Sequence, residues 1–143
     1  MTFRKLRIED FPLFTSFFSD NPLNEEEEDL QVRLEEIEDE IRTSKFEYFG
    51  LLREGMLIGY GKLRSEQEES HFIGPFVLPK YRRKGIGRAI ITHVEGQCQE
   101  RGISRLNAYS FIDTKLATEF LTSIGYKLES VSELGVNVYV KEF

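Results

Sequence analysis

The part of this sequence whose residue types and spacing best suit chemistry is residues 82–88, Arg-Arg-Lys-Gly-Ile-Gly-Arg. It follows an apolar run that ends at Pro79, and an amphipathic helical pattern begins within it. N–H groups at a helix start have no partner inside the helix, and with the helix dipole they bind anions. Gly85 and Gly87 lack Cβ, so the backbone can approach a phosphate closely. The segment predicts a seat for a diphosphate, and a basic turn that only caps a helix is the alternative.

Two other phosphate-binding motifs are excluded by spacing. A Walker loop requires Gly, four residues and then Gly-Lys followed by Ser or Thr, and the sequence lacks that pattern. A dinucleotide fingerprint requires Gly or Ala where Ile90 stands, and an acid about 20 residues later, where the sequence has Arg105. The basic segment must therefore be interpreted on other grounds.

Length and composition predict one globular domain over residues 1–143, with 40% apolar residues, twelve Phe and six Tyr. Cys98 is the single cysteine, so it cannot form an internal disulfide, and with two His it makes a poor zinc site. We expect no bound metal. The sequence has no run of about 20 apolar residues and no signal-peptide pattern, so we expect no membrane partner and a cytoplasmic location.

The charge of −6 is unevenly distributed. Residues 24–40 hold ten acids and one base, Arg33, which leaves a charge of +3 on the rest of the chain. An acidic chain argues against non-specific nucleic-acid binding, because that binding depends on neutralising phosphates. The acidic segment is compatible with a cationic partner, and a solvated helix face is the alternative.

The elements that must position the basic segment follow from periodicity and from helix and turn signals. The pattern predicts helices over residues 10–18, 24–41, 85–100 and 114–124, and strands over residues 3–8, 46–52, 56–63, 71–78, 105–112, 126–128 and 136–140. Asp10 and Asn24 are expected to cap the first two helices. Gly102 and Gly125 are expected to end the last two. Gly74-Pro75 should interrupt strand pairing, because Pro has no N–H to donate. The fold class is α/β (α+β) with a mixed sheet.

In this context residues 82–87 resemble the signature of the GNAT superfamily of acyl-CoA-dependent N-acyltransferases: Arg or Gln, two residues, Gly, one residue, then Gly or Ala. The match extends over residues 71–126, from the strand before the signature to Ala117, Phe120 and Gly125-Tyr126. The resemblance implies a mostly antiparallel sheet of six to seven strands with four helices, splayed around the fourth strand.

The resemblance also implies where acetyl-CoA, as co-substrate, would bind. The pantetheine arm would lie along Pro75, Phe76 and Val77, beside the interrupted strand. The diphosphate would contact the signature residues and the residue after them, namely Arg82, Arg83, Lys84, Gly85, Ile86, Gly87 and Arg88. Packing in the core is the alternative role for Phe76 and Val77.

The resemblance and the residue types also indicate candidate catalytic groups. The resemblance implies a backbone N–H near Phe76 or Val77 that polarises the thioester carbonyl. His71, with Glu69 just before it, is the candidate base, because an imidazole titrates near neutrality. The position of the family's usual acid, a Tyr, holds Leu121. Tyr109 is the candidate acid, and a thiolate that leaves unassisted or takes its proton from water is the alternative. The usual Asn at the start of the last helix is Thr114, next to Asp113.

The function implied is transfer of an acetyl group from acetyl-CoA to a primary amine, which the acidic segment suggests is cationic. A CoA-binding sensor or scaffold without turnover stays open because of Leu121. A nucleic-acid module is poorly supported. The resemblance is compatible with a homodimer.

Overall fold

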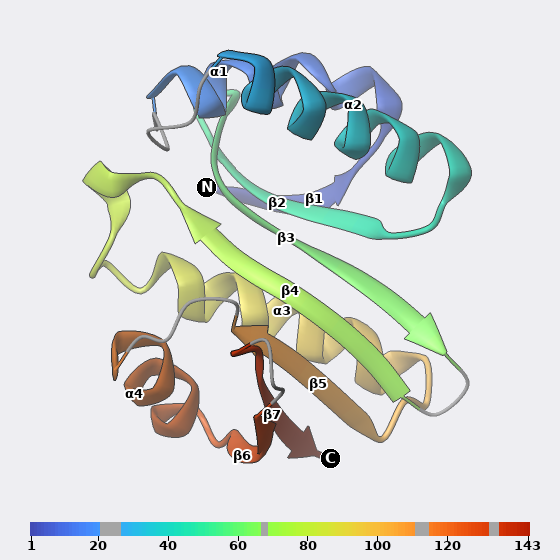
Figure 1. Ribbon diagram of the computed structural model, residues 1–143, viewed down its shortest axis with the longest axis vertical. Coiled ribbons are helices and arrows are strands. Elements are labelled where there is room, and N and C mark those ends of the chain that lie inside the picture. The colour runs from blue at the N-terminus through green and yellow to red at the C-terminus, as the bar shows by residue number, and fades with distance from the viewer. Residues whose placement is uncertain (21–26, 67–68, 111–114, 132–134) are drawn as a thin grey trace. The chain divides into compact units, whose positions relative to one another are not determined.

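The structure is a computed structural model that describes residues 1–20, 27–66, 69–110, 115–131 and 135–143 (Figure 1). Seven strands and four α-helices follow one another along these residues. The strands are β1 (Thr2–Leu6), β2 (Glu47–Arg53), β3 (Met56–Glu66), β4 (Glu69–Val77), β5 (Arg105–Ser110), β6 (Lys127–Val131) and β7 (Asn137–Glu142). The helices are α1 (Pro12–Asp20), α2 (Glu27–Thr43), α3 (Ile86–Glu100) and α4 (Lys115–Ser123), with short 3-10 helices η1 (Ile8–Asp10) and η2 (Pro79–Tyr81).

The strands form one sheet in the order β1-β2-β3-β4-β5-β7-β6. β1 runs antiparallel to β2, and β7 runs antiparallel to both β5 and β6. β4 runs parallel to β5. The prediction of a mixed sheet with four helices is therefore confirmed.

The predicted element boundaries need correction near the N-terminus. Ile8 lies in η1 and not in the first strand, which ends at Leu6. Asp10 does not cap α1: its carboxylate accepts hydrogen bonds from the Arg4 guanidinium (2.7 and 2.8 Å) and from the Arg7 N–H (2.8 Å). These bonds hold the pKa of Asp10 below its usual range, the Arg4 contact being the largest cause. The predicted cap Asn24 lies outside the described residues.

Residue contacts group the chain into two compact units, Met1–Lys62 with Pro75–Ile91 and Leu63–Gly74 with Thr92–Phe143. In the first unit, α1 and α2 lie over β1 and β2 (Figure 1). Its core is aromatic: the Tyr60 ring lies 5.1 Å from Phe14, 5.2 Å from Phe17 and 6.0 Å from Tyr48, centroid to centroid. Tyr48 also donates a hydrogen bond to the buried Glu40 carboxylate (3.1 Å).

The second unit contains β4 up to Gly74, the C-terminal part of α3, β5, α4, β6 and β7. Leu106 and Ala108 of β5 are fully buried, as are Val94 and Cys98 of α3. The predicted apolar stripe of α3 is confirmed, because Ile86, Ile90 and Ile91 are buried as well.

The Gly125-Tyr126 pair ends α4 and ties it to α3. The Gly125 N–H bonds to the Thr122 carbonyl and the Tyr126 N–H to the Leu121 carbonyl, as a left-handed glycine after a helix allows. The Tyr126 hydroxyl then donates to Glu95 of α3 (2.9 Å). The predicted stop at Gly125 is confirmed, and Tyr126 anchors it in the core.

Candidate functional site

The segment between β4 and α3 is held by backbone hydrogen bonds at the end that follows β4. The Leu78 N–H bonds to the Ile58 carbonyl of β3 (3.0 Å), and the Leu78 side chain is 1% exposed. The Tyr81 N–H bonds to the Leu78 carbonyl (2.9 Å), which closes η2. The basic segment therefore starts from an anchored point in the first unit.

The turn itself has an unusual backbone. Arg83 and Gly85 both adopt left-handed conformations, with φ of 61° and 78°. Glycine adopts this region freely, whereas for Arg it is strained. Such turns direct successive N–H groups into one concave site for anions. A Cβ built on Gly85 would meet no atom within 4 Å, so the outer side of the turn is open.

α3 begins directly after this turn, at Ile86 rather than at Gly85 as predicted. The Gly85 carbonyl accepts the bond from Ala89 (3.0 Å), so the helical ladder starts there. The N–H groups of Ile86, Gly87 and Arg88 belong to the first helical turn, where no intrahelical acceptor exists. The helix dipole adds partial positive charge at the same place. These groups together can bind a diphosphate.

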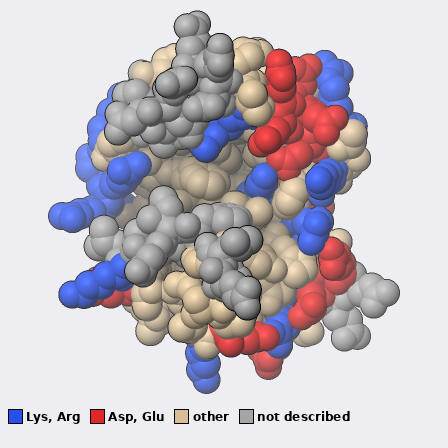
Figure 2. Space-filling model, in the orientation of Figure 1, with Lys and Arg blue, Asp and Glu red and all other residues tan. Residues whose placement is uncertain are grey.

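The basic side chains of the segment have different surroundings. The Arg82 Nε donates to the Val77 carbonyl (3.1 Å), so this guanidinium links the turn to the end of β4. Arg83, Lys84 and Arg88 are exposed. Figure 2 shows Lys and Arg side chains at the left edge of the view, over the segment that follows β4. The structure thus surrounds the open amide groups with positive charge.

β4 carries the three residues predicted to contact a pantetheine arm. Its pairing with β5 runs from Glu69↔Arg105 to Ile73↔Tyr109 and ends before Gly74, as Gly74-Pro75 predicted. Phe76 is 37% exposed, and its ring lies on Tyr60 at 5.0 Å between centroids. A Cβ built on Gly59 would lie 3.2 Å from the Phe76 carbonyl oxygen. The missing Cβ of Gly59 therefore allows β3 to approach β4 at Phe76.

The candidate catalytic residues lie in the second unit, and two of them are in contact. The His71 Nδ1 lies 2.6 Å from the Tyr109 hydroxyl oxygen. Its Nε2 lies 3.5 Å from a Glu66 carboxylate oxygen. Burial raises the pKa of the Tyr109 phenol, so the hydroxyl keeps its proton and can donate it to His71. The structure thus brings together the candidate base His71 and the candidate acid Tyr109, and Glu66 contacts the other ring nitrogen of His71.

Glu69 has a different partner. Its carboxylate lies 3.0 Å from the Arg105 Nε, and the Arg105 guanidinium also contacts Glu129 and Glu142. Glu69 therefore belongs to an ion-pair network around Arg105. The sequence analysis did not single out Glu66. The one feature that could have indicated it is its position at the end of β3, shortly before the strand that carries His71.

Leu121, at the position of the family's usual Tyr, is 4% exposed and packs in the core. Thr114 and Asp113 lie outside the described residues, as do the first acids of the 24–40 segment. Within the described ranges, no group of three or more His, Cys, Asp or Glu side chains could hold a metal ion. In the same ranges, no helix is both long enough and apolar enough to cross a bilayer.

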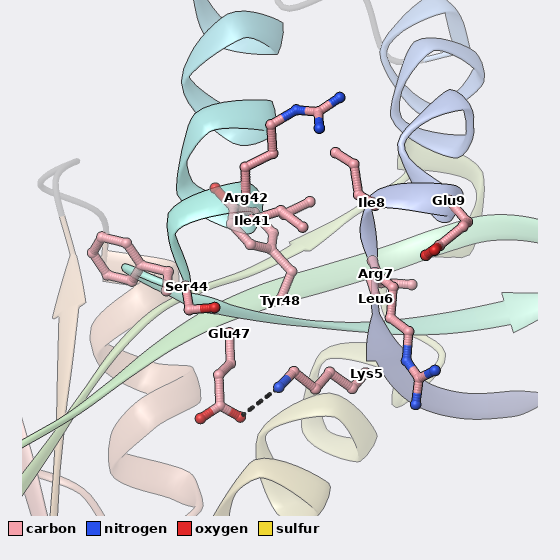
Figure 3. A pocket seen from close by; sticks show the side chains of 11 residues that line it. Lys5, Leu6, Arg7, Ile8, Glu9, Ile41, Arg42, Ser44, Glu47 and Tyr48 are labelled. Carbon is pink, nitrogen blue, oxygen red and sulfur yellow. Dashed lines mark ion pairs between the residues drawn. The ribbon is translucent and has the colours of Figure 1, made fainter.

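A hollow of about 430 Å³ in the first unit contains none of the predicted site residues (Figure 3). Its lining residues are Lys5, Leu6, Arg7, Ile8, Glu9, Ile41, Arg42, Ser44, Phe46, Glu47 and Tyr48. Lys5 pairs with Glu47 across it (3.8 Å), and Arg42 pairs with Glu38 on α2 (3.0 Å). Two of its cations are therefore neutralised by neighbouring acids.

Comparison with known proteins agrees with the sequence pattern. A family model described as acetyltransferase (GNAT) family matches residues 3–126. A Danio rerio protein named "Probable N-acetyltransferase 14" is 33% identical over 49 residues, which are 34% of this chain and 18% of that protein. This match therefore spans less than a fifth of the relative.

Solved structures with the same fold cover the whole chain. The PaiA N-acetyltransferase from Thermoplasma acidophilum, in complex with coenzyme A, superposes with a TM-score of 0.81 at 20% identity, over 99% of this chain and 98% of that one. The ribosomal-protein-alanine N-acetyltransferase from Brucella melitensis superposes with a TM-score of 0.74 at 21% identity, over 100% of both chains. The predicted fold and family resemblance are confirmed.

Proposed function

Because the chain belongs to the acetyltransferase (GNAT) family, we propose that it transfers an acetyl group from acetyl-CoA to a primary amine. The observation that carries the proposal is the start of α3, where left-handed Arg83 and Gly85 precede free helical amides on an open surface. A diphosphate is the anion best matched to such a turn with basic side chains around it.

In this proposal the acetyl-CoA diphosphate accepts hydrogen bonds from the amides of Gly85, Ile86, Gly87 and Arg88. The Arg83 and Lys84 side chains add charge, while Arg82 holds the turn through its bond to the Val77 carbonyl.

The pantetheine arm would lie along Pro75, Phe76 and Val77. We propose that the backbone N–H of Phe76 or of Val77 polarises the thioester carbonyl. Pro75 has no N–H, and the Leu78 N–H is bonded to Ile58. The amine nitrogen attacks the carbonyl carbon, a C–N bond forms and the C–S bond breaks.

We propose His71 as the base that accepts the proton of the substrate ammonium, and Tyr109 as the acid that protonates the leaving thiolate. The contact between their side chains supports a shared proton path, and the raised pKa of Tyr109 keeps the phenol protonated. Glu69 is the weaker candidate base, because its carboxylate is paired with Arg105.

For the acceptor we propose an amine that carries positive charge. Support comes from the exposed acids Glu35, Glu36 and Asp39 of α2. Figure 2 shows a patch of acidic side chains at upper right, on the side where Figure 1 shows α2. A CoA-binding sensor without turnover is the second candidate, and buried Leu121, at the family's usual Tyr position, favours it.

Ligand-dependent thermal unfolding, followed by thiol release, tests the proposal. A ligand that binds only the folded form raises the unfolding temperature according to its affinity. We expect acetyl-CoA and CoA to raise it and ATP and NAD to leave it unchanged. We then expect thiol release from acetyl-CoA with at least one amine of a panel that includes polyamines, amino sugars and lysine peptides.

The outcomes separate the candidates. No shift with CoA would overturn the proposed cofactor. A shift with CoA but no thiol release with any amine would replace the enzyme by the sensor. Replacing Glu35, Glu36 and Asp39 together by the amides, with no change in preference among the amines, would remove the cationic acceptor.

A further inference from the structure

Three positive charges surround the Tyr81 ring in the first unit. The Arg53 guanidinium carbon lies 5.8 Å from the ring centroid, the Lys80 Nζ 5.5 Å and the Lys84 Nζ 5.9 Å. Any two of these charges are therefore within about 12 Å of each other. An aromatic ring attracts cations to its faces, so the Tyr81 ring can keep these three basic side chains close to one another.

The three cations come from separate places in the chain. Arg53 is the last residue of β2, Lys80 lies in η2 and Lys84 lies in the turn before α3. Across the described ranges, the ion pairs between side chains include none of the three. Glu54, the acid next to Arg53, is exposed and has a left-handed backbone. Several like charges gathered without acidic partners favour an anion from outside.

The cluster adjoins the proposed diphosphate seat and shares Lys84 with it. Lys84 lies between Arg83 and Gly85, whose left-handed backbones form the seat, whereas Arg53 and Lys80 lie outside the helix start. Backbone amides with Arg83 can satisfy the diphosphate, so the charges of Arg53 and Lys80 are available to a second anionic group. Coenzyme A carries such a group, the phosphate monoester on its ribose, with a charge near −2 at neutral pH by analogy with other phosphomonoesters.

We propose that Arg53, Lys80 and Lys84, arranged around Tyr81, bind the 3′-phosphate of coenzyme A, so that the protein selects CoA over 3′-dephospho-CoA. This inference rests on the proposed function. It adds a determinant of cofactor selection that the helix start by itself does not provide. Three lysine or arginine side chains can each donate a charge-assisted hydrogen bond to one phosphate.

Titration calorimetry with CoA and 3′-dephospho-CoA at about 150 mM salt tests the inference, because at that ionic strength distant charges are screened. We expect the wild-type protein to bind CoA at least tenfold more tightly. In the double variant R53Q/K80Q this ratio should fall below about threefold, while the affinity for 3′-dephospho-CoA changes by less than about twofold. The matched control is K115Q, which removes an exposed charge of α4 that faces Glu119.

Adenosine 3′,5′-bisphosphate and ADP separate phosphate recognition from general charge attraction. The bisphosphate should compete with CoA more strongly than ADP in the wild-type protein, and this difference should disappear in R53Q/K80Q. Equal wild-type affinity for CoA and 3′-dephospho-CoA would overturn the inference and leave the proposed function intact. The inference would also be overturned if R53Q/K80Q unfolded at the wild-type temperature and still preferred CoA over 3′-dephospho-CoA by the wild-type ratio. Binding of neither cofactor would instead overturn the proposed function.

Discussion

His71 is the residue with the most defined polar surroundings among the candidates for catalysis. Its two ring nitrogens face different partners, the Tyr109 hydroxyl at 2.6 Å and a Glu66 carboxylate oxygen at 3.5 Å. The imidazole is thus held from both sides, which fixes its orientation. A base with a fixed orientation and a protonated phenol beside it is suited to moving protons.

Replacing Tyr109 by Phe tests this arrangement. We expect kcat to fall at least tenfold, because a positioned proton donor typically contributes about 10² to 10⁴ in rate. KM for acetyl-CoA should stay within about twofold, since Tyr109 is not among the residues proposed to hold the cofactor. Steady-state kinetics at saturating amine measure both values.

The control for that variant is Tyr139→Phe, which likewise removes a part-buried hydroxyl contact, here with Thr118 at 2.6 Å, but leaves His71 untouched. Equal kcat values for Y109F and the wild-type protein would remove Tyr109 from the mechanism. Equal losses in both variants would indicate a structural effect.

At the scale of elements, two glycines near α3 and within it have different backbone requirements. Gly85, just before the helix, is left-handed with φ of 78°, whereas Gly96 lies inside it. A Cβ at either position would meet no atom within 4 Å. Space therefore cannot distinguish the two sites, and backbone conformation decides the effect of a side chain.

We expect Gly85→Ala to lower the free energy of unfolding by about 1–2 kcal/mol, the cost of a left-handed conformation for a residue with Cβ. Gly96→Ala should raise it by about 0.5–1 kcal/mol, because alanine favours the helix. Urea denaturation measures both changes. CoA affinity should weaken in the first variant and not in the second, and a stabilising Gly85→Ala would contradict the observed turn.

At the scale of the whole molecule, each unit buries one tyrosine against a glutamate. Tyr48 donates to Glu40 at 3.1 Å, and Tyr126 donates to Glu95 at 2.9 Å. Burial, the largest cause, and the neighbouring carboxylate raise the pKa of both phenols far above their ordinary value of about 10. Both tyrosines therefore stay protonated in the folded protein at alkaline pH.

This arrangement predicts that stability falls above pH ~10. The unfolded chain releases both phenolic protons there while the folded chain retains them, so the folded state loses about 1.4 kcal/mol per pH unit for each tyrosine. The contribution is fully present below pH ~10. Urea denaturation between pH 8 and pH 11 measures the slope, and Tyr126→Phe should remove about half of it. A slope unchanged by that substitution would contradict the prediction.

The sequence alone determined the features that depend on neighbouring residues. The basic segment with its two glycines, the apolar stripe of α3 and the stop at Gly125 are local, because helix ends and periodicity act within a few residues. The end of the β4–β5 pairing at Gly74-Pro75 is also a local feature, because the missing N–H is a property of proline itself. These features predicted the fold and the proposed cofactor seat.

Only the tertiary structure decided which distant side chains meet. The bond between Asp10 and Arg4, the contact of His71 with Tyr109, and the approach of Arg53 to Tyr81 all depend on how strands are paired and where they end. Asp10 reads locally as a helix cap, yet a guanidinium offers it a stronger, charge-assisted bond. Strand order and register arise from burial of the whole core, which no short segment of sequence contains.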